Sequence, residues 1–130
     1  VLTPHPGEFA RLVGKKVSHF EALKLQMDWS RKYGITIVLK GAHTSVSLPS
    51  GDVWFNSTGN PGMASAGMGD TLTGMVVGLI SSGYSSPEAA IFAVYLHGLS
   101  GDLALQTQSV ESLIASDLIS NIGNAFESIG

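Results

Sequence analysis

The sequence of 130 residues contains no cysteine, which excludes both a disulfide framework and a cysteine-based metal site. Charged residues are also scarce, at 13% of the chain, whereas an ordinary globular domain has about 25%. A surface with so few charges leaves apolar area exposed. We therefore expect another chain to cover part of this surface, as in a homo-oligomer.

The sequence also lacks the features typical of proteins that bind nucleic acid, cross a membrane or are secreted. The formal net charge is −3 and no basic run occurs, so nothing indicates nucleic acid or an anionic membrane as a partner. No apolar run approaches the roughly 18 residues of a membrane span. The first residues do not resemble a signal peptide, so we expect a cytoplasmic protein. A length of 130 residues corresponds to about one domain, and 44% apolar residues are enough for a buried core.

The hydrophobic pattern predicts an α/β fold, because strand-like runs come early and helical runs follow. The run 35–41 is β-branched and apolar on both faces, as in a buried parallel strand, and 44–49 and 53–58 flank a hairpin turn at Ser50-Gly51-Asp52. Expected helices lie at about 9–14, 18–34, 68–83, 86–105 and 116–129. The predicted sheet is short, so we interpret it as half of a larger sheet.

A glycine-rich stretch, "GNPGMASAGMGD" (59–70), stands directly before a predicted helix. The first backbone N–H groups of a helix lack intrahelical partners and lie at the positive end of its dipole, so they can bind an anion. Glycines at positions 67 and 69 let a phosphate approach the backbone, and the amides of Gly67, Met68 and Gly69 are candidate donors to it. The stretch is not a Walker A loop, since no Gly-Lys-Ser/Thr follows.

Asp70, at the end of this stretch, carries the sharpest functional hypothesis. A carboxylate beside a phosphate repels it, so its presence favours a base that removes the proton from a hydroxyl attacking phosphorus. The alternative is structural, because an acidic residue also stabilises the N-terminus of a helix.

Three segments taken together resemble one family. They are "TPHPGEF" (3–9), "LKGAHT" (39–44) and "NSTGNPGMASAGMGDTLTG" (56–74), and they are similar to the ADP/ATP-dependent NAD(P)H-hydrate dehydratases of the ribokinase-like superfamily. The resemblance covers nearly the whole chain but only the C-terminal half of the family's domain. It implies the C-terminal part of a three-layer α/β/α domain, with a mostly parallel sheet and a small hairpin, over residues 1–130.

The resemblance also implies a reaction and a set of site residues. ATP or ADP phosphorylates the ring hydroxyl of hydrated NADH or NADPH, and loss of phosphate restores the reduced cofactor; Mg²⁺ normally accompanies such a transfer. Asp70 is then the base and contacts the substrate, the amides of residues 67–69 hold the phosphoryl group, and His5 contacts the substrate. The nucleotide segment consists of Lys40, Gly41, Ala42, His43 and Thr44.

Several of these and other polar residues have a structural alternative. Lys40 is either a phosphate partner or a solvated lysine at a strand end. A histidine in the position of His5, taken alone, is more often structural. His43 occupies a position that varies within the family's nucleotide segment. Glu8 is a candidate to hydrogen-bond water that is bound to a metal ion. The sequence indicates no other metal ligand.

We interpret four residues of the helical part as structural. His97 is expected to be a packed or hydrogen-bonded residue of its helix. Asp102 is expected to lie on the surface. Gly74 and Gly78 are expected to allow close packing of a neighbouring element, because each lowers helix stability.

Two functional alternatives remain open at this point. A small-molecule kinase of the same superfamily shares Gly-x-Gly-Asp but releases a stable phosphoester. A non-catalytic nucleotide-binding fragment has the loop without turnover. The N-terminal half of the family's domain is absent from this chain and is its expected partner.

Overall fold

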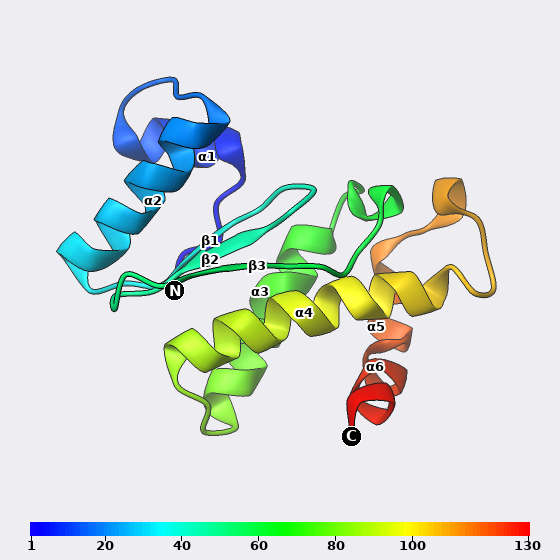
Figure 1. Ribbon diagram of the computed structural model, residues 1–130. Helices are drawn as coiled ribbons and strands as arrows, with labels where there is room; N and C mark the ends of the chain where they lie inside the picture. The colour runs from blue at the N-terminus through cyan, green and yellow to red at the C-terminus, as the bar shows by residue number, and fades with distance from the viewer. The chain divides into compact units, whose positions relative to one another are not determined.

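Figure 1 shows the computed structural model of the chain, which describes residues 1–130 as two units, Val1–Asn56 and Ser57–Gly130. Each unit is described by itself. The first contains α1 Pro6–Val13, α2 His19–Tyr33, β1 Ile37–Leu39, β2 Ser45–Ser47 and β3 Val53–Phe55. The second contains η1 Pro61–Met63, α3 Met68–Ser81, α4 Ser86–Ala104, η2 Val110–Ser112, α5 Ala115–Ser120 and α6 Ile122–Ile129.

Helix α2 begins at the residue that the sequence predicts, whereas α1 begins at Pro6, before the expected range 9–14. Ser18 caps α2: its hydroxyl accepts from the Glu21 N–H at 3.3 Å, and the Glu21 carboxylate accepts from the Ser18 N–H at 2.9 Å. Helix α2 ends at Gly34, as predicted. Its inner face and α1 enclose a core in which Phe9, Ala22 and Ile37 are buried.

The sheet of the first unit has the order β1-β2-β3, and both pairings are antiparallel. The predicted hairpin is confirmed, with Ser47 opposite Val53. The predicted strand 35–41 is shorter, Ile37–Leu39, and pairs antiparallel with β2; its parallel contact is a single bridge to Leu2. The short connection between β1 and β2 explains this, because a parallel neighbour needs a crossover of a dozen or more residues.

A buried polar layer joins α2 to the sheet. The Gln26 amide donates to the carbonyls of Ile37 at 2.9 Å and of Ser45 at 3.0 Å, and it accepts from the Ser45 hydroxyl at 2.8 Å. The Ser30 and Ser47 hydroxyls lie 2.5 Å apart. Since these four side chains are buried and paired, they fix the register of the helix on the strands.

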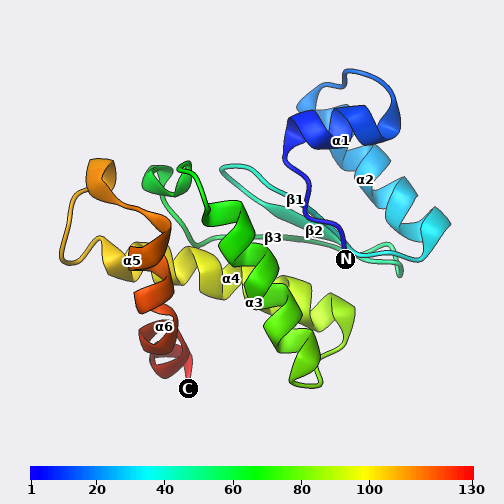
Figure 2. The same ribbon diagram turned by 180° about the vertical axis from the view of Figure 1, so that it is seen from behind.

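Helices α3 and α4 lie side by side in the second unit, with α5 and α6 beside the later part of α4 (Figures 1 and 2). The predicted helices 68–83 and 86–105 are confirmed, and Pro87 lies in the first turn of α4. A core cluster of Met68, Ala104, Leu113 and Leu118 connects the start of α3 to α4 and α5. The loop before α3 is therefore anchored by the first residue of the helix.

One prediction about the helices of the second unit is wrong, and another finds no support within this chain. The expected single helix 116–129 is divided at Asn121, whose side chain donates to the Asp117 carbonyl at 2.9 Å and competes with the continuing helical backbone. Gly74 and Gly78 are exposed, and a Cβ atom built on either would meet nothing within 4 Å, so no element of this chain packs closely there. None of the helices combines the length and apolar character that crossing a membrane requires.

Candidate active site

The glycine-rich stretch ends in a helix start that leaves backbone donors available. Gly67 is the N-terminal cap of α3 at φ 84°, a left-handed conformation that favours glycine, and no side chain caps the helix there. The Met68 side chain is buried, and the Met68 N–H donates to the Ser65 carbonyl in a long hydrogen bond of 3.5 Å. The amides of the first turn, which includes Gly69, have no partner within the helix and lie at its positive end. This arrangement can bind a phosphate.

Asp70 lies in this same first turn and is exposed to solvent. Its carboxylate is thus accessible beside the backbone donors of residues 67–69. The structure places all four residues predicted for the catalytic loop on one helix start. This geometry can hold a phosphoryl group and present a base next to it.

The Asn-Pro-Gly turn before the loop is held from α4, which sequence reasoning missed. The Asp102 carboxylate accepts from the Gly59 N–H at 2.8 Å and from the Asn60 side-chain amide at 2.9 Å. The Asn60 side-chain oxygen in turn accepts from the Gly62 N–H at 3.1 Å. Asp102 is half-buried, so the surface position predicted for it is wrong. No local pattern in the sequence indicates this contact, because Asp102 and its partners are more than 40 residues apart.

His97 is a hydrogen-bonded histidine of α4, as predicted. Its Nε2 atom lies 2.9 Å from the Met68 carbonyl oxygen, so α4 also contacts the first turn of α3. Both ends of the segment between Gly59 and Met68 are thereby connected to one helix.

In the first unit, His5 caps α1 through its ring. Its Nδ1 atom accepts from the N–H groups of Gly7 at 3.0 Å and Glu8 at 3.2 Å. Since Nδ1 accepts, the neutral ring carries its proton on Nε2, which is the atom left to donate to a ligand. The structural role considered for His5 and the predicted substrate contact therefore use different ring nitrogens.

Glu8 and Lys40 lie beside His5. The Glu8 carboxylate accepts from the His5 N–H at 2.7 Å, and its oxygens are 3.5 Å from His5 Nε2 and 3.9 Å from Lys40 Nζ. The His5 N–H bond lowers the pKa of Glu8 below its ordinary value, and the nearby charges of Lys40 and Arg11 act in the same direction. The Lys40 N–H donates to the Pro4 carbonyl at 3.0 Å, which joins the two predicted segments.

The predicted nucleotide segment continues from Lys40 as an exposed turn. The Gly41 N–H donates to the Thr44 hydroxyl at 3.3 Å, and this hydroxyl lies 3.2 Å from the Gly41 carbonyl. Gly41, Ala42 and His43 are exposed. The turn therefore offers its backbone and the His43 ring to solvent.

The predicted site residues thus form two groups, one in each unit. In the first unit, Glu8 contacts both His5 and Lys40. In the second unit, residues 67–70 are consecutive and form the start of α3. Nowhere in residues 1–130 do three or more histidine, aspartate or glutamate side chains gather as they would around a metal ion.

The uncapped glycine-rich start of α3, with an exposed aspartate in its first turn, is an arrangement that can bind a phosphate. The family model for NAD(P)H-hydrate dehydratase matches residues 1–124, and the chain belongs to this family. A bifunctional NAD(P)H-hydrate repair enzyme of Moorella thermoacetica is 43% identical over 121 residues, which are 92% of this chain and 23% of that protein.

Two solved structures extend this comparison to the fold. The ADP/ATP-dependent NAD(P)H-hydrate dehydratase of Bacillus subtilis, co-crystallised with ATP/Mg²⁺ and soaked with CoA, is 36% identical with a TM-score of 0.91; the match covers 100% of this chain and 49% of that one. A ribokinase-like superfamily protein of Enterococcus faecalis is 32% identical with a TM-score of 0.78, over 98% of this chain and 44% of that one. The predicted ribokinase-like α/β fold is confirmed, and the chain spans half or less of the length of these relatives.

Proposed function

We propose that residues 1–130 are the C-terminal portion of a single ribokinase-like dehydratase domain that returns hydrated NADH or NADPH to its reduced form with ATP or ADP. The observation that carries the proposal is the start of α3, where Gly67 leaves backbone donors uncapped and Asp70 is exposed in the same turn. Family membership supports the choice of substrate. The N-terminal half of the domain is the proposed partner, and the protein is proposed to be cytoplasmic.

In the proposed reaction, Asp70 takes the proton from the ring hydroxyl while the hydroxyl oxygen attacks the terminal phosphorus of the nucleotide. The bond from phosphorus to the nucleotide breaks, and the shortened nucleotide leaves. Phosphate then departs from the ring with its bonding electrons, while the adjacent ring carbon loses a proton and the double bond is restored. The amides of residues 67–69 stabilise the negative charge on the transferred group.

The first unit contributes the remaining proposed roles. His5 donates to the hydrated nicotinamide through Nε2, and Lys40 to Thr44 bind the nucleotide, with the Lys40 ammonium near its phosphates. A metal ion at this site would be held chiefly by nucleotide phosphates and water, since Mg²⁺ needs few protein ligands and the chain has no acidic cluster for it.

The test is recovery of reduced-nicotinamide absorbance from hydrated NADH with Mg²⁺ and either ATP or ADP. We expect the unchanged chain to recover it, and Asp70→Asn to lose about 10² to 10⁴ in turnover while its nucleotide affinity stays within a few-fold, because the amide cannot accept the proton. Asp28→Asn is the matched control, since Asp28 is an exposed aspartate on α2.

Other results identify the alternatives. A phosphorylated product that accumulates indicates a kinase, and nucleotide binding without turnover indicates a non-catalytic fragment. Full activity in Asp70→Asn would remove the base assignment. Absence of turnover in the unchanged chain would contradict dehydration by these 130 residues alone, and the same assay would then be made with the N-terminal half added.

A further inference from the structure

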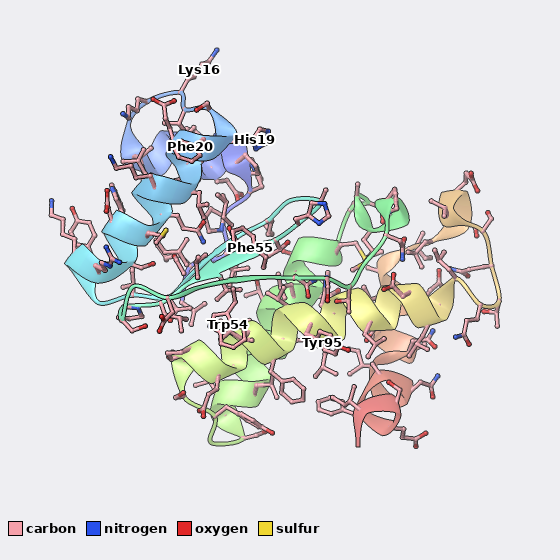
Figure 3. The ribbon with its side chains drawn as sticks, viewed as in Figure 1. Lys16, His19, Phe20, Trp54, Phe55 and Tyr95 are labelled. Atoms are coloured by element: carbon pink, nitrogen blue, oxygen red, sulfur yellow. The ribbon has the colours of Figure 1, made fainter.

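One face of α4 holds the segment that leads to the glycine loop. Tyr95, Gly98 and Asp102 are three and four residues apart and therefore share this face; Tyr95 is labelled on α4 in Figure 3. The Tyr95 carbonyl accepts from the Thr58 hydroxyl at 2.8 Å, and Asp102 accepts from Gly59 and Asn60.

The fit between this face and the segment leaves no space for a larger residue. A Cβ atom on Gly98 would lie 2.6 Å from the Thr58 carbonyl carbon, which is a backbone atom and cannot move aside alone. A Cβ atom on Gly101 would lie 2.5 Å from the Met63 sulfur. The backbone of the segment therefore lies directly on α4.

Asp102 is the charged member of this contact. A carboxylate can accept from two donors at once, and hydrogen bonds to a charged group are about twice as strong as neutral ones. Both of its donors belong to the Asn-Pro-Gly turn, and the Asn60 side chain passes the constraint on to Gly62 through its oxygen. A neutral asparagine at this position would offer one acceptor and place an N–H₂ group against the Asn60 amide.

We propose that Asp102 is a positioning residue, which fixes the turn 59–62 and through it the backbone of Gly67, Met68 and Gly69. The inference rests on the proposed function of that loop. Four residues separate the turn from Gly67, and His97 holds the other end through the Met68 carbonyl. With both ends attached to α4, a shift at the turn is transmitted to the donors of the loop.

A reciprocal exchange of the two side chains tests this role. In Asp102→Asn two amide donors face each other, and in Asn60→Asp two carboxylates face each other, so each single variant breaks the contact. In the double variant Asn60→Asp/Asp102→Asn, the new carboxylate accepts from Gly62 N–H and from the new amide, whose oxygen accepts from Gly59 N–H. All three hydrogen bonds are then possible again. Glu127→Gln on α6 is the control for loss of a carboxylate, since Glu127 is exposed.

The first measurement is the amide ¹H–¹⁵N spectrum of this chain, which needs no turnover. We expect both single variants to move the amide peaks of Gly67 and Gly69 as well as those of Gly59 and Gly62, and the double variant to return all four toward their original positions. The control leaves them unchanged. If the peaks of Gly67 and Gly69 stay in place in both single variants, Asp102 does not position the loop and the inference is overturned.

The second measurement separates positioning from stability. At a temperature well below the unfolding midpoint, we expect kcat to fall by about 10- to 100-fold in each single variant, because small misplacements at a reacting centre cost up to about 10²-fold. The double variant should recover to within about three-fold. A lower unfolding midpoint with kcat and KM unchanged would show a purely structural role. If the unchanged chain has no turnover, the proposed function fails for this chain, and the spectra alone decide the role of Asp102.

Discussion

At the scale of single residues, Gln26 shows how many hydrogen bonds one buried polar side chain can make inside a small unit. It is fully buried on α2, and its amide bonds to two carbonyls and one hydroxyl of the sheet. Buried polar groups that lose such partners retain the cost of their desolvation. Gln26 therefore stabilises the fold only while all of these hydrogen bonds are made.

Gln26→Leu tests this at constant side-chain size. We expect the free energy of unfolding to fall by about 2–4 kcal/mol, because each buried polar group left unpaired costs roughly 1–3 kcal/mol. Denaturant unfolding followed by circular dichroism measures it. Gln106→Leu, at an exposed position just after α4, is the control and should change stability by less than about 0.5 kcal/mol. A loss below 1 kcal/mol for Gln26→Leu would mean that the polar layer is not needed for stability.

How far a single residue could be predicted depended on the distance to its partners. The start of the helix expected at 18–34 could be predicted because both members of its capping pair, Ser18 and Glu21, lie in one turn. The environment of Asp102 could not be predicted, since its donors come from a distant turn. The loop residues 67–70 were predicted from local backbone chemistry, while their assigned roles stay predictions.

At the scale of elements, the starts of the longer helices and the hairpin of β2 and β3 followed from the sequence, whereas the direction of β1 did not. Serine, proline and glutamate fix the first turn of α4 through neighbouring atoms, so its start was predicted correctly. The direction of β1 relative to β2 depends on the connection between them, which carries no hydrophobic periodicity. The break at Asn121 depends on one side-chain amide within an otherwise continuous apolar pattern.

Helix α3 contains two glycines that nothing in this chain requires. We expect the double variant Gly74→Ala/Gly78→Ala to stabilise the chain by about 1–2 kcal/mol, because alanine is better than glycine by about 0.8–1 kcal/mol at each helical position and both sites have open space. Thermal unfolding of the chain measures it. Gly98→Ala is the opposite control, since the Thr58 backbone occupies its space, and should destabilise. Destabilisation by the double variant would instead mean that a partner covers this face.

At the scale of the whole molecule, the chain exposes large apolar side chains in both units. Phe20, labelled in Figure 3 on the first turn of α2, is 81% exposed, Trp54 on β3 is 55% exposed, and Val77 on α3 is 56% exposed. Such residues are normal singly, but here few charges separate them. The chain also spans about half of the Bacillus subtilis enzyme that it matches.

We expect self-association through this surface, and the charge fraction alone predicts it as well. We expect light scattering on the chain, coupled to size-exclusion chromatography, to give a mass that is a multiple of 13.6 kDa and that falls on dilution. The dependence on dilution separates reversible association from aggregation, and circular dichroism of the eluted fraction confirms that the associated species is folded. A folded protein of 13.6 kDa at all concentrations would contradict the prediction. The exposed apolar residues would then be tolerated by a monomer, and 13% charged residues would suffice to keep it apart from its copies.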